Sequence, residues 1–180
     1  MNMFARGMPN QLLRLQEMHN GEKVQPTFSA GEMERRQNAM RRILEELKLD
    51  AAILTSYHNI CYFSDFLYCS FGRRYAFVIT PEKATSVTAG IDAGQPWRRT
   101  FGDNITYTDW QRDNFFHALQ QLLPGATRLG IEFDQVNLDL RRLLEEAFPG
   151  VEFVDIGSPT MWLRTIKSAE EIVLIKEGAA

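Results

Sequence analysis

The sequence predicts an α/β fold in which a mixed central sheet is flanked by helices. Two segments of helical pattern, 111–123 and 138–148, each stop at a Pro-Gly pair and lead into a short apolar run, at 128–133 and 151–156. This order of a helix, a Pro-Gly stop and a strand occurs twice, which indicates that helices are layered on a sheet. The chain has 180 residues, 44% of them hydrophobic, which is long enough for one well-buried core.

A further helix is expected between Ser29 and about Lys48. Ser29 and Glu32 have the spacing of a capping box, in which a hydroxyl and a carboxylate satisfy free backbone N–H groups at a helix start. Asn137 is expected to cap the helix at 138–148 in a similar way. Apolar residues of the first helix recur at helical spacing, at Met33, Met40, Ile43, Leu44 and Leu47.

The other strands are expected where short apolar runs lie between turn residues. Residues 51–55 form such a run, and 75–80 and 84–91 are two strands joined by a turn at 81–83. Residues 105–108 form a shorter strand pattern.

The two ends of the chain differ from its middle. Residues 1–27 contain two glycines and two prolines but no sustained period, which predicts an extended arm. Ser168 and Glu171 form a second capping box, which starts a helix with an apolar stripe. Two interpretations of this helix stay open: it ends at Gly178 as a C-terminal cap, or its apolar face packs on a further domain.

Composition excludes several classes of protein. With 20 Lys and Arg against 23 Asp and Glu, the formal charge is −3, so no large basic field is available for nucleic acid or an anionic membrane. No segment reaches the run of about 18 apolar residues that spans a membrane, and no signal peptide is recognisable. The two cysteines, Cys61 and Cys69, have no C-x-x-C spacing. A cytoplasmic protein is expected.

No complete active site is visible in the sequence. The three histidines, His19, His58 and His117, stand outside any H-E-x-x-H or Ser/His/Asp pattern, so surface or structural roles are expected for them. Adjacent glutamates occur in pairs on helical segments, where they supply solvated faces. No metal ion and no cofactor is expected.

The densest feature is an aromatic stretch from Tyr57 to Phe77, which holds eight of the chain's twenty aromatic residues. In its middle, Phe71, Gly72 and Arg73 place a flexible glycine between an aromatic ring and a guanidinium. Such an arginine, projected from apolar surroundings by a tight bend, is suited to bind a carboxylate through two parallel hydrogen bonds. The alternative is that the aromatic residues form core and the arginine is a solvated turn residue.

A smaller candidate lies at residues 95–99, where Trp97 is followed by two arginines. This segment suits ring stacking and a cation–π contact. It is equally consistent with a loop anchor.

Four stretches of this chain resemble the creatinase family, and the likeness runs from about Asn20 to the last residue. The segment Ile166-Lys167-Ser168-Ala169-Glu170-Glu171 also resembles the linker found across the wider creatinase, prolidase and aminopeptidase P group. The more specific stretches are Thr55-Ser56-Tyr57-His58-Asn59-Ile60, Ser64-Asp65-Phe66-Leu67-Tyr68-Cys69-Ser70-Phe71-Gly72-Arg73, Asp92 with Gly94-Gln95-Pro96-Trp97-Arg98-Arg99-Thr100, and Tyr107-Thr108-Asp109-Trp110-Gln111-Arg112-Asp113-Asn114.

The resemblance implies a division into an extended arm (1–27), an α/β domain (28–165) and the start of a linker helix (166–180) into a pita-bread catalytic domain. It implies a homodimeric, metal-free enzyme that hydrolyses creatine to sarcosine and urea, with its catalytic residues in that second domain. It also implies that Arg73 binds the creatine carboxylate and Phe71 walls the pocket, across the dimer interface. Taken alone, the chain is expected to be inactive.

The sequence departs from the family pattern after the substrate-binding arginine, where Arg74 replaces a proline, and extra positive charge or a looser loop is expected there. Two other functions stay open. One is a free-standing binding or dimerisation module that has lost catalysis. The other is the N-terminal domain of a metal-dependent aminopeptidase P or prolidase relative.

Overall fold

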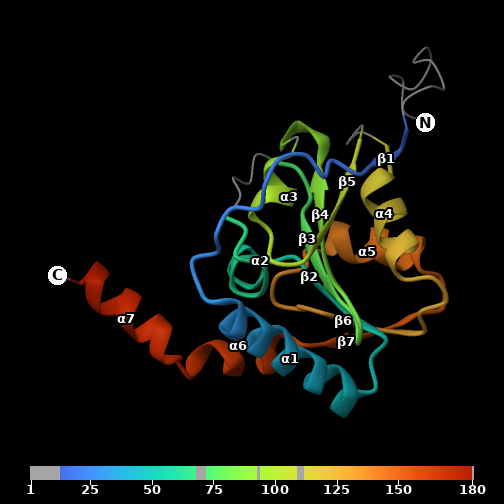
Figure 1. Cartoon of the computed structure of the whole chain (residues 1–180). Coiled ribbons are helices and arrows are strands. Elements are labelled where there is room, and N and C mark those ends of the chain that lie inside the picture. Colours follow the sequence, from blue (N-terminus) through green and yellow to red (C-terminus); the bar gives the residue numbers. More distant parts are fainter. Residues whose placement is uncertain (1–12, 68–71, 93, 109–111, 180) are drawn as a thin grey trace.

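The computed structural model describes residues 13–67, 72–92, 94–108 and 112–179 (Figure 1). Strands within these residues form one seven-stranded mixed sheet, which confirms the predicted fold class. The strands are β1 (Leu15–Gln16), β2 (Ala51–Leu54), β3 (Ala76–Ile79), β4 (Ala84–Ala89), β5 (Asp103–Tyr107), β6 (Arg128–Ile131) and β7 (Glu152–Asp155), and their spatial order is β1-β5-β4-β3-β2-β6-β7.

The direction of the strands decides which residues meet at each edge of the sheet. Strands β2, β6 and β7 are parallel, β3 is antiparallel to both β2 and β4, and β4 is parallel to β5. Five strands therefore run in one direction, against β1 and β3. One edge of the sheet collects the carboxyl ends of those five strands together with the segment that enters β3.

Helices cover both faces of the sheet. Figure 1 shows α1, α2 and α6 on one face and α4 and α5 on the other. The helical elements are α1 (Ala30–Leu47), α2 (Tyr57–Ser64), the 3-10 turn η2 (Gly90–Asp92), α3 (Gln95–Arg99), α4 (Asn114–Leu122), α5 (Leu138–Ala147), α6 (Gly157–Thr165) and α7 (Ala169–Gly178).

The core is continuous between these layers because the central strands bury side chains on both of their faces. Every residue of β2, β3 and β4 is buried. Phe63 of α2, Leu119 of α4 and Leu144 of α5 close the core from the two helical layers. Most of the described aromatic residues between Tyr57 and Phe77 belong to this core, as the alternative interpretation of that stretch expected.

Three helices, α2, α3 and α6, were not predicted from the sequence. Helix α2 is rich in aromatic residues, which favour strands, but Ser56 caps it by accepting a hydrogen bond from the backbone N–H of Asn59 at 3.2 Å. Helix α6 begins without any side-chain cap. Besides the Ser56 cap, packing on α1 and β3 stabilises α2, and packing on α1 stabilises α6, in which Thr160 is buried.

The first capping box is only half formed. Ser29 Oγ accepts from the backbone N–H of Glu32 as expected, at 3.2 Å. The Glu32 carboxylate turns away to Arg35 and Arg36, and Glu170 of α7 accepts from the Ser29 backbone N–H instead, at 2.8 Å. The expectation of a complete box at this helix is therefore wrong, because two arginines compete for the carboxylate. The second box, at Ser168 and Glu171, is complete.

The described part of the arm, residues 13–27, is extended and adds β1 antiparallel to β5 at the sheet edge. At the other end of the chain, α7 leads away from the body of the fold (Figure 1), and none of its residues is buried. Ile172, Val173 and Ile175 of α7 are 43%, 53% and 56% exposed. No helix within the described ranges is long and apolar enough to cross a membrane.

Candidate functional site

Arg73 lies at the sheet edge where the carboxyl ends of β4 and β5 meet. The segment that carries it enters β3 and brings the half-buried side chain beside those strand ends. The carboxyl edge of a sheet is where α/β folds most often bind ligands. Arg73 lines a cavity of about 280 Å³ here, together with Gln16, Ala89, Gly90, Ile91, Tyr107 and Thr108.

The bend that carries Arg73 depends on glycine. Gly72 has a φ of +75°, a left-handed conformation that L-residues with a Cβ rarely adopt. This confirms the expectation that a glycine bend precedes the arginine. Phe71, the other predicted substrate-binding residue, lies outside the described residues, so only Arg73 of the predicted pair is placed.

Tyr107 forms a buried wall of the Arg73 cavity and stays uncharged. Its ring is 2% exposed, and its hydroxyl donates to the backbone carbonyl of Arg74 at 2.9 Å. Burial raises the pKa of Tyr107 to about 12, although that hydrogen bond and the charges of Arg73 and Arg74 oppose the rise. At neutral pH the phenol is therefore protonated and does not neutralise the guanidinium beside it.

Arg74 points away from the cavity and toward α5. Its guanidinium forms an ion pair with Asp139 at 3.1 Å and lies 5.6 Å from the ring centroid of Phe116. The extra positive charge at this position is therefore matched by an acid on the neighbouring helix. Arg73 is the cationic side chain among the described residues that line the cavity.

The groups that line this cavity are suited to binding a charged small molecule. The cavity combines a guanidinium with neutral polar groups of Gln16 and Thr108 and with the 72% exposed apolar side chain of Ile91. A carboxylate on a small molecule matches such a lining. No group of three or more His, Cys, Asp or Glu side chains that could hold a metal ion occurs within the part of the chain that the structure describes.

Residues 36–166 match the family model described as Creatinase/Prolidase N-terminal domain. The chain belongs to this family.

A curated relative of this creatinase/prolidase N-terminal domain is the protein named Creatinase from Bacillus sp. (strain B-0618). The two are 52% identical over 165 residues, which cover 89% of this chain and 40% of that protein. The chain thus spans about 40% of the length of this relative. The family resemblance predicted from the sequence is confirmed.

Solved structures share the fold at much lower identity. The Xaa-Pro dipeptidase from Bacillus anthracis has a TM-score of 0.69 and 20% identity, over 81% of this chain and 39% of that chain. The Creatinase/Prolidase N-terminal domain of an X-Pro dipeptidase from Streptococcus pyogenes has a TM-score of 0.62 and 16% identity, over 73% of this chain and 98% of that chain. At such identities the likeness concerns the fold alone.

Within this creatinase/prolidase N-terminal domain, Trp97 anchors the arm. The ring of His19 stacks on Trp97 at 3.9 Å between centroids, and Lys23 Nζ lies 3.7 Å from the Trp97 ring centroid. Lys23 also donates to the backbone carbonyl of Thr100 at 3.0 Å. The stacking and the cation–π contact predicted for this segment are therefore both present, and they serve the loop anchor that was the alternative.

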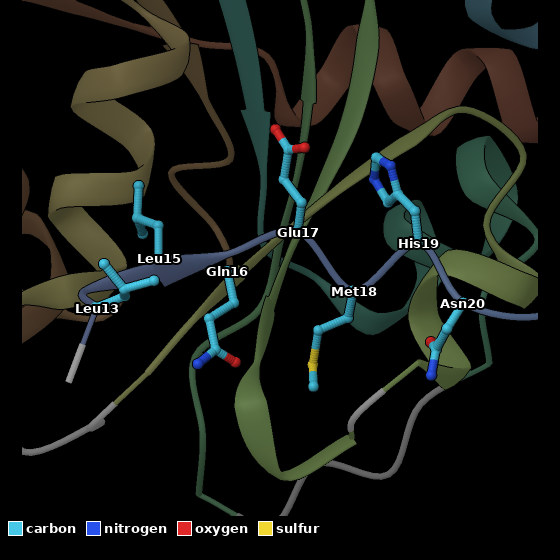
Figure 2. A pocket seen from close by; sticks show the side chains of 7 residues that line it. All are labelled: Leu13, Leu15, Gln16, Glu17, Met18, His19 and Asn20. Carbon is cyan, nitrogen blue, oxygen red and sulfur yellow. The ribbon is translucent and has the colours of Figure 1, made fainter.

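The arm also forms one side of a second, shallower hollow of about 560 Å³ along residues 13–20. Figure 2 shows Glu17 and His19 on one side of the extended chain, with Gln16 and Met18 on the other. This alternation follows from the two-residue period of a strand. The polar side chains consequently point in opposite directions and do not converge on one ligand.

The other predicted surface groups behave as expected. His117 lies on α4. Its pKa is lowered mainly by burial and, to a smaller extent, by the positive charge of Arg14. Glu145 and Glu146 of α5 form ion pairs one turn away on the same helix, with Arg141 and Arg142. These pairs stabilise a solvated helix face.

Sequence reasoning missed Glu132, the most densely bonded carboxylate at the carboxyl edge of the sheet. It is 1% exposed and accepts from the backbone N–H groups of Thr55 and Ser56 at 2.6 and 2.9 Å. Ser56 Oγ and Asn59 Nδ2 donate to its other oxygen, at 2.5 and 2.6 Å. The available signal was an acid directly after a buried strand, a place where a charge needs partners.

Proposed function

We propose that this chain is the N-terminal domain of a creatinase, an enzyme that uses water to cleave creatine into sarcosine and urea, and that the domain contributes substrate-binding residues. The 52% identity to Creatinase from Bacillus sp. (strain B-0618) supports the reaction class. The observation that carries the proposal is the position of Arg73, half-buried on the Gly72 bend and lining a cavity at the carboxyl edge of the sheet. Arg73 binds the creatine carboxylate, and Phe71 forms the adjacent wall.

The proposal assigns binding to this domain and bond cleavage to another part of a longer enzyme. The cavity around Arg73 is open and presents a cation at one side, so a second surface must bind the guanidinium end of creatine. In a homodimer, the partner subunit supplies that surface. The exposed apolar residues of α7 are consistent with a helix that packs on a further domain.

A function as the N-terminal domain of a prolidase or aminopeptidase P has less support than a function in a creatinase. The dipeptidase structures share 16% and 20% identity with this chain, against 52% for Creatinase. A free-standing binding module would leave the apolar face of α7 in water, at a cost in free energy.

The test joins this chain to the catalytic domain of a creatinase and compares Arg73→Ala with Arg74→Ala. A charge-assisted hydrogen bond contributes about 1.5–3 kcal/mol, so Arg73→Ala is expected to raise KM for creatine about 10- to 100-fold. Arg74→Ala is the matched control, since Arg74 pairs with Asp139, and KM is expected to stay the same. An unchanged KM in Arg73→Ala would remove this residue from the site.

Mixed dimers test whether Arg73 acts across the dimer interface. Subunits with Arg73→Ala are mixed with subunits inactivated in the second domain. Activity is measured at a creatine concentration near the wild-type KM, where the first kind of subunit alone is weakly active and the second is inactive. If Arg73 acts in trans, one of the two sites of each mixed dimer combines an intact catalytic domain with an intact Arg73, and activity returns. If Arg73 acts in cis, no site is complete and the mixture is no more active than the Arg73→Ala subunits alone.

A further inference from the structure

A third cavity, of about 380 Å³, lies where the end of the arm, α1, α2 and the α6–α7 segment meet. We call it the junction pocket. It is separate from the Arg73 cavity, with which it shares no lining residue. Its size lies within the range of cavities that bind small molecules.

Two buried cationic nitrogens line the junction pocket without a hydrogen-bond partner. Among the described residues, four buried side-chain polar atoms lack one, and two of the four are Arg36 Nη2 and Arg164 Nε. Both side chains line this pocket. An unpaired buried donor costs free energy, more so when it is charged. Their meeting at one cavity indicates a place for an acceptor group.

The Arg36 guanidinium is fixed, so Nη2 cannot turn to another partner. Arg36 is 1% exposed; its Nε donates to Glu32 at 2.7 Å and its Nη1 to the Tyr62 carbonyl at 3.0 Å. The rings of Phe28 and Tyr62 hold its central carbon, at 3.9 and 4.3 Å from their centroids. The remaining nitrogen, Nη2, lies 3.5 Å from Glu171 Oε1 and forms an ion pair with it, but no hydrogen bond.

The charges around the junction pocket favour an anion. Three arginine or lysine side chains line it, against two acidic ones. Both acids already accept hydrogen bonds from backbone N–H groups: Asp65 from Thr27 at 2.6 Å and Glu171 from Ser168 at 2.9 Å. The lining therefore carries one more positive than negative charge. Glu32, which pairs with Arg36 from outside the lining, also pairs with Arg35, so an added carboxylate still gains attraction from the cations of the pocket.

The walls of the pocket are apolar and aromatic. Tyr62 is buried, while Tyr57 and Leu67 are 43% and 65% exposed and line the same cavity. A bare inorganic ion would leave these side chains in water. A ligand with an apolar body covers them and places its charged end at the arginines.

We propose that the junction pocket binds a small organic carboxylate, whose oxygens accept from Arg36 Nη2 and Arg164 Nε and whose apolar body lies against Tyr57, Tyr62 and Leu67. Because the pocket is built from both ends of the chain, such a ligand also ties the arm and α1 to the α6–α7 segment. This site is independent of the proposed creatine site at Arg73.

The test uses benzoate as the probe and benzamide, its uncharged isostere, as the control, with ¹⁵N-labelled protein. Arginine Nε–Hε signals report directly on the proposed contact. Benzoate is expected to shift the Arg164 Nε–Hε signal in a saturable way, with a dissociation constant of about 1 mM for a ligand of its size. Benzamide is expected to leave this signal in place.

Variants separate the junction pocket from other cationic sites. Arg164→Gln is expected to weaken benzoate binding about tenfold or more, through loss of a charge-assisted hydrogen bond. Arg73→Ala and the exposed Arg142→Gln are expected to leave it unchanged. Equal binding of benzamide, no saturable shift at Arg164, or weakening by Arg73→Ala each overturns the proposal. Since the wild-type shift at Arg164 is read directly, the result does not depend on how well Arg164→Gln folds.

Discussion

Glu132 offers the sharpest test of how this sheet edge is stabilised. One oxygen of its buried carboxylate accepts from the backbone N–H groups of Thr55 and Ser56, and the other accepts from Ser56 Oγ and Asn59 Nδ2. These bonds connect the end of β6 to the turn between β2 and α2. Two substitutions at this position, Glu132→Gln and Glu132→Ala, are expected to have very different costs.

The structure predicts the size of each cost. In Glu132→Gln the amide oxygen still accepts from both backbone N–H groups. The new NH₂ donates to Asn59 Oδ1 once the Asn59 amide rotates, because Oδ1 has no hydrogen-bond partner now. The charge assistance and the acceptor of the Ser56 hydroxyl are lost, at a cost of about 1–2 kcal/mol. Glu132→Ala leaves two buried backbone donors of Thr55 and Ser56 unpaired and opens a cavity, for a total of about 4 kcal/mol.

Urea unfolding followed by circular dichroism measures both variants against the wild type. Glu46→Gln, on the exposed face of α1, is the control and is expected to change the free energy of unfolding by less than about 0.5 kcal/mol. A cost below about 1 kcal/mol for Glu132→Ala would refute the reasoning. A Glu132→Gln cost equal to that of Glu132→Ala would do the same, since the two differ in whether the backbone donors keep an acceptor.

Three further predictions concern α1, α7 and one turn. The pKa of Glu32 is lowered to about 2, mainly by hydrogen bonds from Arg35. Hydrogen bonding to Arg36 lowers it further, while burial opposes the shift. The folded pKa lies below the unfolded value of 4.5, so the ionised Glu32 stabilises the fold by up to about 3 kcal/mol above pH 4.5, and this stabilisation is lost as the pH falls toward 2. Urea unfolding at pH 5 and pH 3 is expected to show this loss in the wild type and not in Glu32→Gln. Glu170→Ala removes the contact with Ser29 and is expected to speed hydrogen exchange in the first turn of α7. Gly102→Ala is expected to lower stability by about 2 kcal/mol or more in thermal unfolding, because φ is +125° and the new Cβ would lie 2.6 Å from the backbone oxygen of Ala84.

Each of these has an outcome that contradicts it. An unchanged pH dependence in Glu32→Gln would show that another carboxylate dominates the acid range. Glu177→Ala, at the exposed end of α7, is the control for Glu170→Ala, and equal exchange in the two variants counts against the Ser29 contact. Gly178→Ala meets open space and is the control for Gly102→Ala, so equal stability of these two would disprove the steric argument.

Much of the fold was predictable from local patterns. The Pro-Gly stops, the cap at Asn137 and the box at Ser168 are where the sequence placed them, because each depends on residues within a few positions of one another. Helix α2 and the partner of Glu32 were missed for the opposite reason. An aromatic stretch of this kind is a helix here because Ser56 and the buried Glu132, far apart in the sequence, meet at its first turn.

The candidate site divides in the same way. The glycine bend before Arg73 is a local property and was predicted. That Tyr107 walls the cavity and that Asp139 draws Arg74 away from it depend on strands and helices brought together by the sheet order. The junction pocket had no signal in the sequence, since its lining comes from positions 27 to 171.

The sequence by itself determined the α/β class, the helix caps at Asn137 and Ser168, and the arginine on a glycine bend, because spacing carries these properties along the chain. It also indicated the family, through the resemblance of several stretches to known members. The tertiary structure alone decided which charges are buried and which partners they find. Those contacts join residues far apart in sequence. Their free energies depend on burial, which no local pattern records.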